Sequence, residues 1–330
     1  MLMNGKWTAD WHPVQAKDDH GRFVRQVSSF RNWITADGSP GPTGTGGFKA
    51  EAGRYRLYVA LICPWASRTL IARQVKGLER LIAVTVVNPV LTSEGWAFSG
   101  YPGSNADPLH GAAYLHELYT HADSTYTGRA TVPVLWDEKT DTIVSNESAD
   151  IVRMFNTAFA ELVPEMPDLY PSDLGIEIEA LNADVYERLN NGVYKAGFAS
   201  TQAAYDEAVA GVFAMLDQLE ARLTDMYLFG NRLTETDIRL FVTLIRFDAA
   251  YHGLFKTNRK RIADYPRLSA YMERVMRLPG VAKTVNLEHI KAGYYSIKAL
   301  NPNGIVPAGP DHVQVLLDRV RQDVYVAFNI

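Results

Sequence analysis

The stretch RYRLYVALICPWASRTLIARQVKG, residues 54–77, decides the fold and holds the only cysteine of the chain. Its first part, Tyr55 to Leu61, alternates β-branched and aromatic residues with others, which predicts a strand. After Cys63 and Pro64 the apolar residues recur at helical spacing, and Gly77 fits the end of a helix. The stretch therefore predicts a strand that turns at Cys63 into a helix.

Cys63 would then lie at the start of that helix, which favours the ionised thiolate. Unpaired N–H groups and the positive end of the helix dipole stabilise an anion there, and Arg68 adds positive charge one turn on. Pro64 suits the first helical position, because its missing N–H costs nothing. A lone cysteine is also a common small core residue, so the residue type alone leaves a packing role open.

Composition bounds the class of protein. The 330 residues suffice for two domains, and 47% apolar with 21% charged residues is typical of a globular protein. A net charge of −4 gives no reason to expect a nucleic-acid partner, and no stretch is apolar for long enough to cross a membrane. A single cysteine favours a reducing, cytoplasmic setting and requires an external thiol as redox partner.

The order of predicted elements indicates a thioredoxin-like N-terminal domain followed by an all-α domain. Strands are expected over 55–61, 81–90, 131–136 and 142–144, with helices after Cys63, over 112–122 and from residue 147. From residue 172 onward the periodicity is helical, and Thr234 to Asp237 has the form of a capping box before an apolar run. The predicted parts are an N-terminal arm (1–52), the thioredoxin-like domain (53–157), the helical domain (172–290) and a C-terminal arm (291–330).

Residue composition marks the two arms and the boundary between the two domains. Four aromatic residues in the first arm indicate that it is anchored: Trp7, Trp11, Phe30 and Trp33. The segment between the domains is marked by prolines, among them Pro164. The second arm is rich in proline and glycine, with a short helix expected near Val313 to Arg321.

Two further segments suit a peptide ligand. Thioredoxin-like folds place a cis proline opposite the active-site helix, so Val132-Pro133 is a candidate, although a trans proline at a strand end is the alternative. Residues 145–148 (SNES) precede a helix, so its amides and the Ser148 hydroxyl could receive a carboxylate, while Glu147 could pair with an ammonium group. The same four residues also fit an ordinary helix cap.

The segment YVxLxCPWAxRT, residues 58–69, resembles the active-site segment of the Xi-class glutathione transferases, the glutathionyl-hydroquinone reductases. The similarity runs nearly end to end. Other matching segments are FRNWI (30–34), GWAF (95–98), TVPVLWD (131–137), SNES (145–148), NNGVYKAGF (190–198) and NPxGIVP (301–307).

The resemblance implies a glutathione site and a second-substrate site. Glutathione would contact Trp96, Arg129, Val132, Pro133, Glu147 and Ser148. Tyr194 and Tyr294 would bind the quinol oxygens, because a phenol donates a hydrogen bond at neutral pH. The sequence reads GYYSIK at 293–298 where a His-Tyr-Tyr-x-Ser-His run is common, so Tyr294 and Tyr295 are both candidates.

No metal is expected from spacing. His110, His116 and His121 do not share one helix face, and no second cysteine joins them.

The resemblance implies reductive removal of glutathione from a glutathionyl-hydroquinone, through a Cys63–glutathione mixed disulfide that a second glutathione resolves. The products would be the hydroquinone and oxidised glutathione, and the family commonly forms homodimers. Three alternatives are a conjugating glutathione transferase, a general thiol transferase or dehydroascorbate reductase, and a non-catalytic interaction protein on the same fold.

Overall fold

The computed structural model describes residues 1–9, 17–163 and 166–328. It contains two compact units, one formed by Met1–Pro13 with Gln26–Pro167 and the other by Val14–Arg25 with Asp168–Ile330. Trp11 and Pro164 lie outside the described residues.

The first unit is organised around a four-stranded mixed sheet in the order β4-β3-β5-β6. β3 pairs in parallel with β4 and antiparallel with β5, and β5 pairs antiparallel with β6. The prediction of a thioredoxin-like fold is confirmed, with each strand inside or next to its expected range. The strands are β3 (Tyr55–Val59), β4 (Ile82–Val86), β5 (Val134–Asp137) and β6 (Thr142–Ser145).

The central strand β3 is buried on both faces, since Tyr55, Leu57, Tyr58 and Val59 are all inaccessible to solvent. Aromatic and β-branched side chains suit such a pleated interior surface. β3 therefore fixes the position at which the chain leaves the sheet and begins the next helix.

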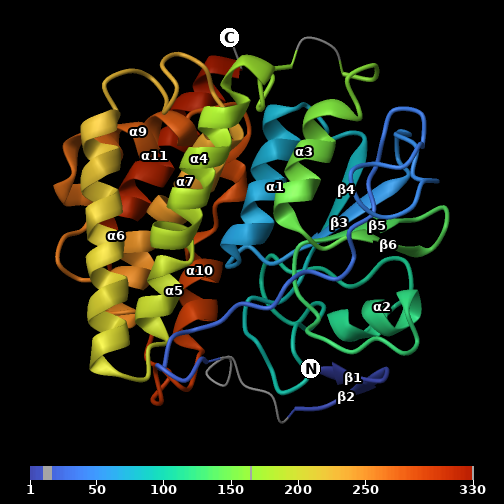
Figure 1. The fold of residues 1–330 in the computed structure, drawn as a ribbon, viewed down its shortest axis with the longest axis horizontal. Helices are drawn as coiled ribbons and strands as arrows, with labels where there is room; N and C mark the ends of the chain where they lie inside the picture. The colour runs from blue at the N-terminus through green and yellow to red at the C-terminus, as the bar shows by residue number, and fades with distance from the viewer. Residues whose placement is uncertain (10–16, 164–165, 329–330) are drawn as a thin grey trace. The chain divides into compact units, whose positions relative to one another are not determined.

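Three helices accompany the sheet, and α1 and α3 lie side by side (Figure 1). They are α1 (Pro64–Val75), α2 (Leu115–Ala122) and α3 (Ser148–Thr157). α1 ends as the sequence predicts: Gly77 has a φ of +62° and donates to Gln74, and Leu78 donates to Arg73. These two bonds form a Schellman motif, which favours glycine at the left-handed position.

The N-terminal arm is anchored in the first unit from residue 26 onward, whereas its residues 17–25 belong to the second unit. Phe30 accepts a backbone bond from Asn146, and Asn32 donates to Val144, so the arm runs along the outer strand β6. Arg31 also pairs with Asp150 of α3. The arm thereby covers hydrogen-bonding groups that an edge strand would leave open. Its first residues form a short antiparallel hairpin that the sequence did not predict, β1 (Leu2–Met3) and β2 (Lys6–Trp7).

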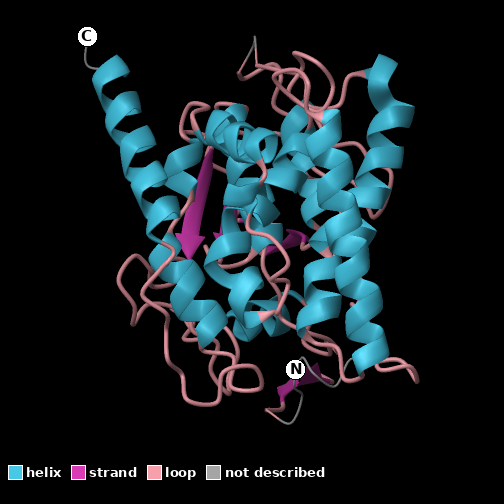
Figure 2. Cartoon of the chain, turned by 90° about the vertical axis from the view of Figure 1, so that its left-hand side faces the viewer, coloured by secondary structure: helices cyan, strands magenta, loops and turns pink. Residues whose placement is uncertain are grey.

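Helices, drawn in cyan in Figure 2, are the elements that the structure assigns to the described residues of the second unit. The α-helices are α4 (Gly175–Val185), α5 (Gly192–Gly197), α6 (Gln202–Arg222), α7 (Glu235–Arg246), α8 (His252–Leu254), α9 (Pro266–Met276), α10 (Leu287–Tyr295) and α11 (Asp311–Phe328). Single turns of other helix types are η2 (Ser172–Leu174), η3 (Tyr186–Asn190), η4 (Phe247–Tyr251), η5 (Ile262–Asp264) and η6 (Val281–Thr284). The C-terminal helix is longer than the predicted segment near Val313 to Arg321, because proline and glycine stop before residue 311 and do not interrupt it. None of the helices in the described ranges has the length and apolar character that a membrane crossing requires.

The predicted capping box starts α7. Thr234 is the N-cap, and the fully buried Asp237 carboxylate accepts bonds from the Thr234 amide at 2.8 Å and its hydroxyl at 3.0 Å. The same carboxylate accepts from the Leu228 amide at 3.0 Å and the Tyr271 hydroxyl at 2.9 Å. One side chain therefore ties the start of α7 to the preceding loop and to α9.

We predict that Asp237→Ala lowers the free energy of unfolding by about 3 kcal/mol or more, because it removes the one carboxylate to which four buried groups donate. Chemical denaturation measures the change. Asp225→Ala is the matched control, because Asp225 is an exposed acceptor of one hydroxyl in the same unit. Equal stability of the two variants would contradict this assignment.

Candidate functional site

Cys63 is the N-cap residue of α1, as the sequence predicts, and Pro64 occupies the first helical position. The Cys63 carbonyl accepts the Ser67 amide at 3.0 Å, and the sulfur-bearing residue is half-buried. The first turn of α1 holds no acidic side chain. The helix end therefore offers an anion its N–H groups and the positive end of the dipole without an opposing carboxylate in that turn.

The loop before β5 approaches this sulfur. Val132-Pro133 is a cis peptide, which confirms that prediction, and the Cys63 thiol donates to the Val132 carbonyl at 3.5 Å. Val132 and Pro133 are both buried. The arrangement places main-chain atoms of an irregular segment beside the helix end, where an extended peptide can pair with them.

Arg68, expected to add positive charge near the sulfur, is buried with its guanidinium stacked over the Trp65 ring at 4.3 Å. The stacking is a cation–π contact that fixes the guanidinium on the first turns of α1. Its charge is thus held on the helix that carries Cys63.

Glu147 acts as the helix cap that the sequence allowed. It is the N-cap of α3: its Oε1 accepts the Ala149 amide at 3.1 Å, and its Oε2 accepts the Ser28 hydroxyl at 2.9 Å. Ser148 is the first residue of the helix, and its hydroxyl donates to Glu147 at 3.5 Å. The carboxylate keeps lone pairs for a cationic group, since two oxygens have about four acceptor sites.

Trp96 and Arg129 belong to the same unit and are both half-buried. The Trp96 carbonyl accepts the amide of Leu115 at the start of α2, and the Arg129 carbonyl accepts the Tyr126 hydroxyl. Their backbones are thus fixed by local bonds. The role of their side chains toward a ligand stays a prediction.

The second unit brings Tyr194 and Tyr294 together although they are 100 positions apart. Their hydroxyl oxygens lie 2.6 Å apart, and the Tyr294 oxygen lies 2.8 Å from that of Tyr251. The three phenols form one chain of hydrogen bonds with Tyr294 in the middle. Tyr295 is half-buried and is not a member of this chain. The structure thus pairs Tyr294, and not Tyr295, with Tyr194.

Burial controls the protonation of these phenols. It raises the pKa of Tyr251 and of Tyr294 well above the usual value for tyrosine, and a nearby buried guanidinium, Arg246, offsets the effect only in part. Both groups are therefore hydroxyl donors at neutral pH.

No periodic pattern in the sequence marks Tyr251, because the residue lies where the helical register changes. Residues 247–251 form a wide turn in which the His252 amide donates to the Phe247 carbonyl. A similar wide turn, closed by the Asn191 amide on Tyr186, precedes the helix that carries Tyr194. Such turns alter the 3.6-residue spacing on which pattern reading depends, and they are common at functional sites.

A cation also borders the phenol chain. The Arg25 guanidinium lies 5.0 Å from the centre of the Tyr194 ring, and its Nε donates to Asn191 at 3.0 Å. Arg25 comes from the N-terminal arm but belongs to the second unit. No motif marks it in the sequence, since only the folded arm brings it to the ring.

Two of the histidines considered from spacing also come together. His110, His121 and Asp141 have ligand atoms within 4.8 Å of one another, a set that could hold a metal ion. Helical register could not reveal this set, because His110 precedes α2 and Asp141 lies in the turn between β5 and β6.

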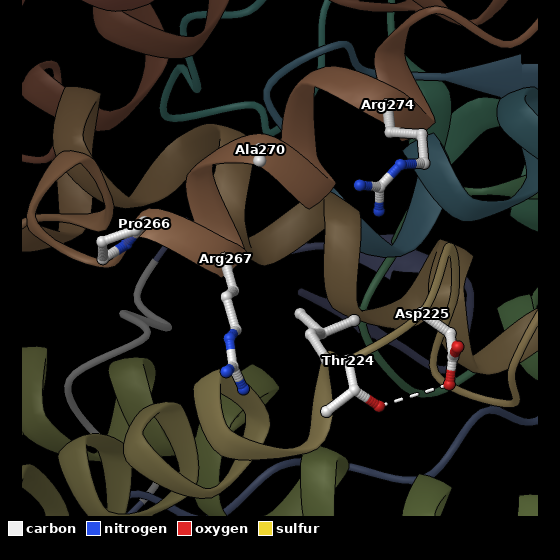
Figure 3. Close-up of a pocket in the computed structure, with 7 residues that line it drawn as sticks. Thr224, Asp225, Pro266, Arg267, Ala270 and Arg274 are labelled. Atoms are coloured by element: carbon white, nitrogen blue, oxygen red, sulfur yellow. Dashed lines mark hydrogen bonds between the residues drawn. The ribbon is translucent and has the colours of Figure 1, made fainter.

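A surface pocket of about 350 Å³ in the second unit is lined in part by two arginines that bond to backbone carbonyls (Figure 3). Arg267 donates to the Ala221 carbonyl at 3.2 Å, and Arg274 donates to the Met226 carbonyl at 2.7 Å. The guanidinium groups thus satisfy carbonyls at and just beyond the end of α6. The lining residues are Leu223, Thr224, Asp225, Pro266, Arg267, Ala270 and Arg274.

Comparison with known proteins agrees with this division. The family model described as "Glutathione S-transferase, N-terminal domain" matches residues 62–158, and the one described as "Glutathione S-transferase, C-terminal domain" matches residues 202–274. The first match begins one residue before Cys63, and the second covers most of α6 to α9.

Individual relatives are similar over nearly the whole chain. The glutathionyl-hydroquinone reductase YqjG of Escherichia coli is 54% identical, and the match covers 94% of this chain and 94% of YqjG. The glutathionyl-hydroquinone reductase PcpF of Sphingobium chlorophenolicum is 48% identical, and the match covers 94% of this chain and 96% of PcpF. The glutathione-bound structure of YqjG has a TM-score of 0.87 at 51% identity, covering 94% of this chain and 95% of that chain. The glutathione-S-transferase Xi of Phanerochaete chrysosporium has a TM-score of 0.83 at 49% identity, covering 87% and 97%.

We predict that Tyr251→Phe lowers the free energy of unfolding by about 1 kcal/mol, because it removes a buried hydrogen bond and leaves Tyr294 with one phenolic partner. Denaturant titration measures the change. Tyr295→Phe, outside the phenol chain, is the control and should stay close to the unmodified protein. If both substitutions cost the same, the hydroxyl chain does not stabilise this unit.

Proposed function

The chain belongs to the Xi-class glutathione transferases, and from this premise we propose that it removes glutathione from glutathionylated hydroquinones through a mixed disulfide on Cys63. The observation that carries the proposal is the position of the only cysteine, at the N-cap of α1 and 3.5 Å from the Val132 carbonyl. Relatives named glutathionyl-hydroquinone reductase support the choice of reaction.

Two sulfur exchanges complete the reaction. The Cys63 thiolate attacks the sulfur of the substrate, so an S–S bond forms while the aryl C–S bond breaks, and the ring carbon keeps the electron pair and takes a proton. The thiolate of a second glutathione then attacks the glutathione sulfur of the mixed disulfide, releases oxidised glutathione and restores Cys63. In the sum of the two steps, the ring carbon gains the two electrons that the substrate's glutathione sulfur and the sulfur of the second glutathione lose as they form the disulfide, so no further oxidant or reductant is needed.

The thioredoxin-like unit would hold the glutathione. Main-chain atoms at Val132 would pair with the tripeptide, and the amides at Ser148 would receive its γ-glutamyl carboxylate. Glu147, already fixed as a cap, would accept the α-ammonium group. The indole of Trp96 and the guanidinium of Arg129 are donors, which suits a ligand with two carboxylates.

The phenols of the second unit would bind the oxygens of the aromatic substrate. Tyr194 would donate to a quinol oxygen as negative charge develops on the ring. Tyr294, held between Tyr194 and Tyr251, would be the second phenol, because its hydroxyl is buried and protonated. Tyr251 would position Tyr294 and not touch the substrate.

The cellular compartment and the oligomeric state are part of the proposal. A reaction that consumes free glutathione suits the cytoplasm, and a chain with one cysteine has no resolving thiol of its own. We also propose a homodimer, which equilibrium sedimentation would test.

We predict that Cys63→Ala lowers turnover of a glutathionylated hydroquinone by at least about a thousandfold while retaining binding of a glutathione analogue. The variant loses the nucleophile but leaves the caps and loops of the glutathione site in place. Chromatography of released hydroquinone gives turnover, and calorimetry gives binding.

The same variant separates the alternatives. A conjugating transferase activates the sulfur of glutathione itself, so its rate would survive the loss of Cys63. A thiol transferase or dehydroascorbate reductase would lose activity too, but the unmodified protein would prefer disulfides or dehydroascorbate to glutathionylated quinols. A non-catalytic protein would turn over none of these substrates.

We predict that Tyr194→Phe lowers kcat by about a hundredfold, because it removes a donor that strengthens as charge develops. Tyr205→Phe is the matched control, since its phenol is bonded to the Lys256 carbonyl in the same unit. Tyr294→Phe should resemble Tyr194→Phe, whereas a larger loss in Tyr295→Phe would show that the wrong tyrosine of the pair has been chosen.

A further inference from the structure

Three side chains converge at the surface of the first unit, away from any role given above. The His110 Nε2 atom lies 2.7 Å from Asp141 Oδ1, and the His121 Nε2 atom lies 2.7 Å from Asp141 Oδ2. They come from the loop before α2, from the last turn of α2, and from the turn between β5 and β6. The two imidazole rings are neighbours, with centres 4.6 Å apart. We call this set the His110–His121–Asp141 cluster.

His110 lies between two carboxylates. Its Nδ1 is buried and faces Asp107 Oδ2 at 3.6 Å, while its Nε2 faces Asp141. The Asp107 side chain is buried and accepts bonds from the Tyr58 hydroxyl at 2.8 Å and the His110 amide at 3.0 Å, so it acts as an acceptor.

A neutral imidazole has only one N–H, so it cannot satisfy both carboxylates. With the proton on Nδ1, facing Asp107, the Nε2 lone pair points at an oxygen of Asp141. In that tautomer the two lone pairs, 2.7 Å apart, repel each other unless a cation lies between them. In the other tautomer Nε2 donates to Asp141, and the buried Nδ1 lone pair faces an Asp107 oxygen at 3.6 Å with no donor between them. A second proton on the ring is one such cation, and a metal ion is the other.

The surroundings suit a metal ion. A carboxylate behind the outer nitrogen of a ligating histidine is the usual arrangement at metal sites, and Asp107 stands in that place for His110. The buried indole of Trp136 lies beside both imidazoles: its ring centre is 5.1 Å from that of His110 and 5.8 Å from that of His121. His121 and Asp141 are exposed, so water can reach the remaining coordination positions.

We propose that the His110–His121–Asp141 cluster binds a divalent ion of the zinc type through the two Nε2 atoms and one carboxylate oxygen, with Asp107 orienting His110. Two imidazoles and one carboxylate form a ligand set that zinc accepts, with water completing the shell. Tetrahedral coordination separates ligand atoms by about 3.3 Å, so the 2.7 Å contact between the ligating oxygen of Asp141 and its imidazole neighbour opens by roughly half an ångström, while the other imidazole moves to the same oxygen. Exposed turn and loop residues permit that shift.

The ion would act as a cross-link. It would join the loop before α2 and the end of α2 to the hairpin of β5 and β6, and so raise the temperature of unfolding by an amount that grows with the logarithm of the free ion concentration above Kd. The site takes no part in the sulfur exchange at Cys63, so its failure would leave the proposed function untouched.

The test is titration of the full chain carrying Cys63→Ser, which removes the one competing thiol. Zn²⁺ is followed by calorimetry and Co²⁺ by its visible spectrum, with Mg²⁺ as the ion that oxygen-only sites prefer. We expect one Zn²⁺ per chain, a Co²⁺ spectrum typical of nitrogen and oxygen ligands, and a higher unfolding temperature with Zn²⁺ than with Mg²⁺.

Variants identify the ligands. His121→Gln and Asp141→Asn should each weaken Zn²⁺ binding about tenfold or more. His312→Gln is the matched control, because His312 is also an exposed histidine bonded to a carboxylate, Asp248, at 2.9 Å; it should bind as the parent does. Equal Zn²⁺ affinity in the parent and both cluster variants, or no binding by the parent at micromolar Zn²⁺, would overturn the proposal.

Discussion

The end of one helix is the constraint on which the rest of the structure depends. Cys63 can meet both the open amides of α1 and the Val132 carbonyl only because the buried strand β3 delivers it to that point. Pro64 begins the helix at once, and the glycine-terminated motif at Gly77 ends it before β4. A shift of one residue in this connection would turn the sulfur away from the loop, so the sheet specifies the position of the thiol.

In the second unit, the surroundings of three tyrosines keep their hydroxyl groups protonated and fix the direction in which they point. Burial keeps Tyr251 and Tyr294 as neutral donors, and the shared hydrogen bonds set where each hydroxyl points. Under the proposed function, a flexible phenol would lose orientation when bound to a planar aromatic substrate, and an ionised phenol would repel the negative charge that develops on the ring. The chain of three phenols meets both requirements through burial and shared hydrogen bonds.

Short-range patterns in the sequence predict those elements whose structure depends mainly on neighbouring residues. The strand and helix around Cys63 and the capping box at Asp237 have short-range signals, and the structure confirms them. The cis proline was expected from the thioredoxin-like fold, and the structure confirms it too. Tyr251, Arg25 and the meeting of His110 with Asp141 had no such signal. Each depends on long-range packing: a wide helical turn, a folded arm and a hairpin that reaches a distant loop. Resemblance to a family named Tyr194 and left Tyr294 open against Tyr295. The structure pairs the Tyr294 hydroxyl with that of Tyr194 at 2.6 Å, and the choice of Tyr294 as the residue that faces the substrate stays a prediction.

The most direct test of the account is the identity of the sulfur that attacks. A single turnover of a glutathionylated hydroquinone, run without free glutathione and stopped by acid, can be read by intact-mass and peptide-mass measurement. The account predicts that hydroquinone is released in an amount equal to the enzyme and that glutathione remains attached to the peptide containing Cys63. Release of hydroquinone with Cys63 unmodified, or an aryl group attached to that sulfur in place of glutathione, would contradict it.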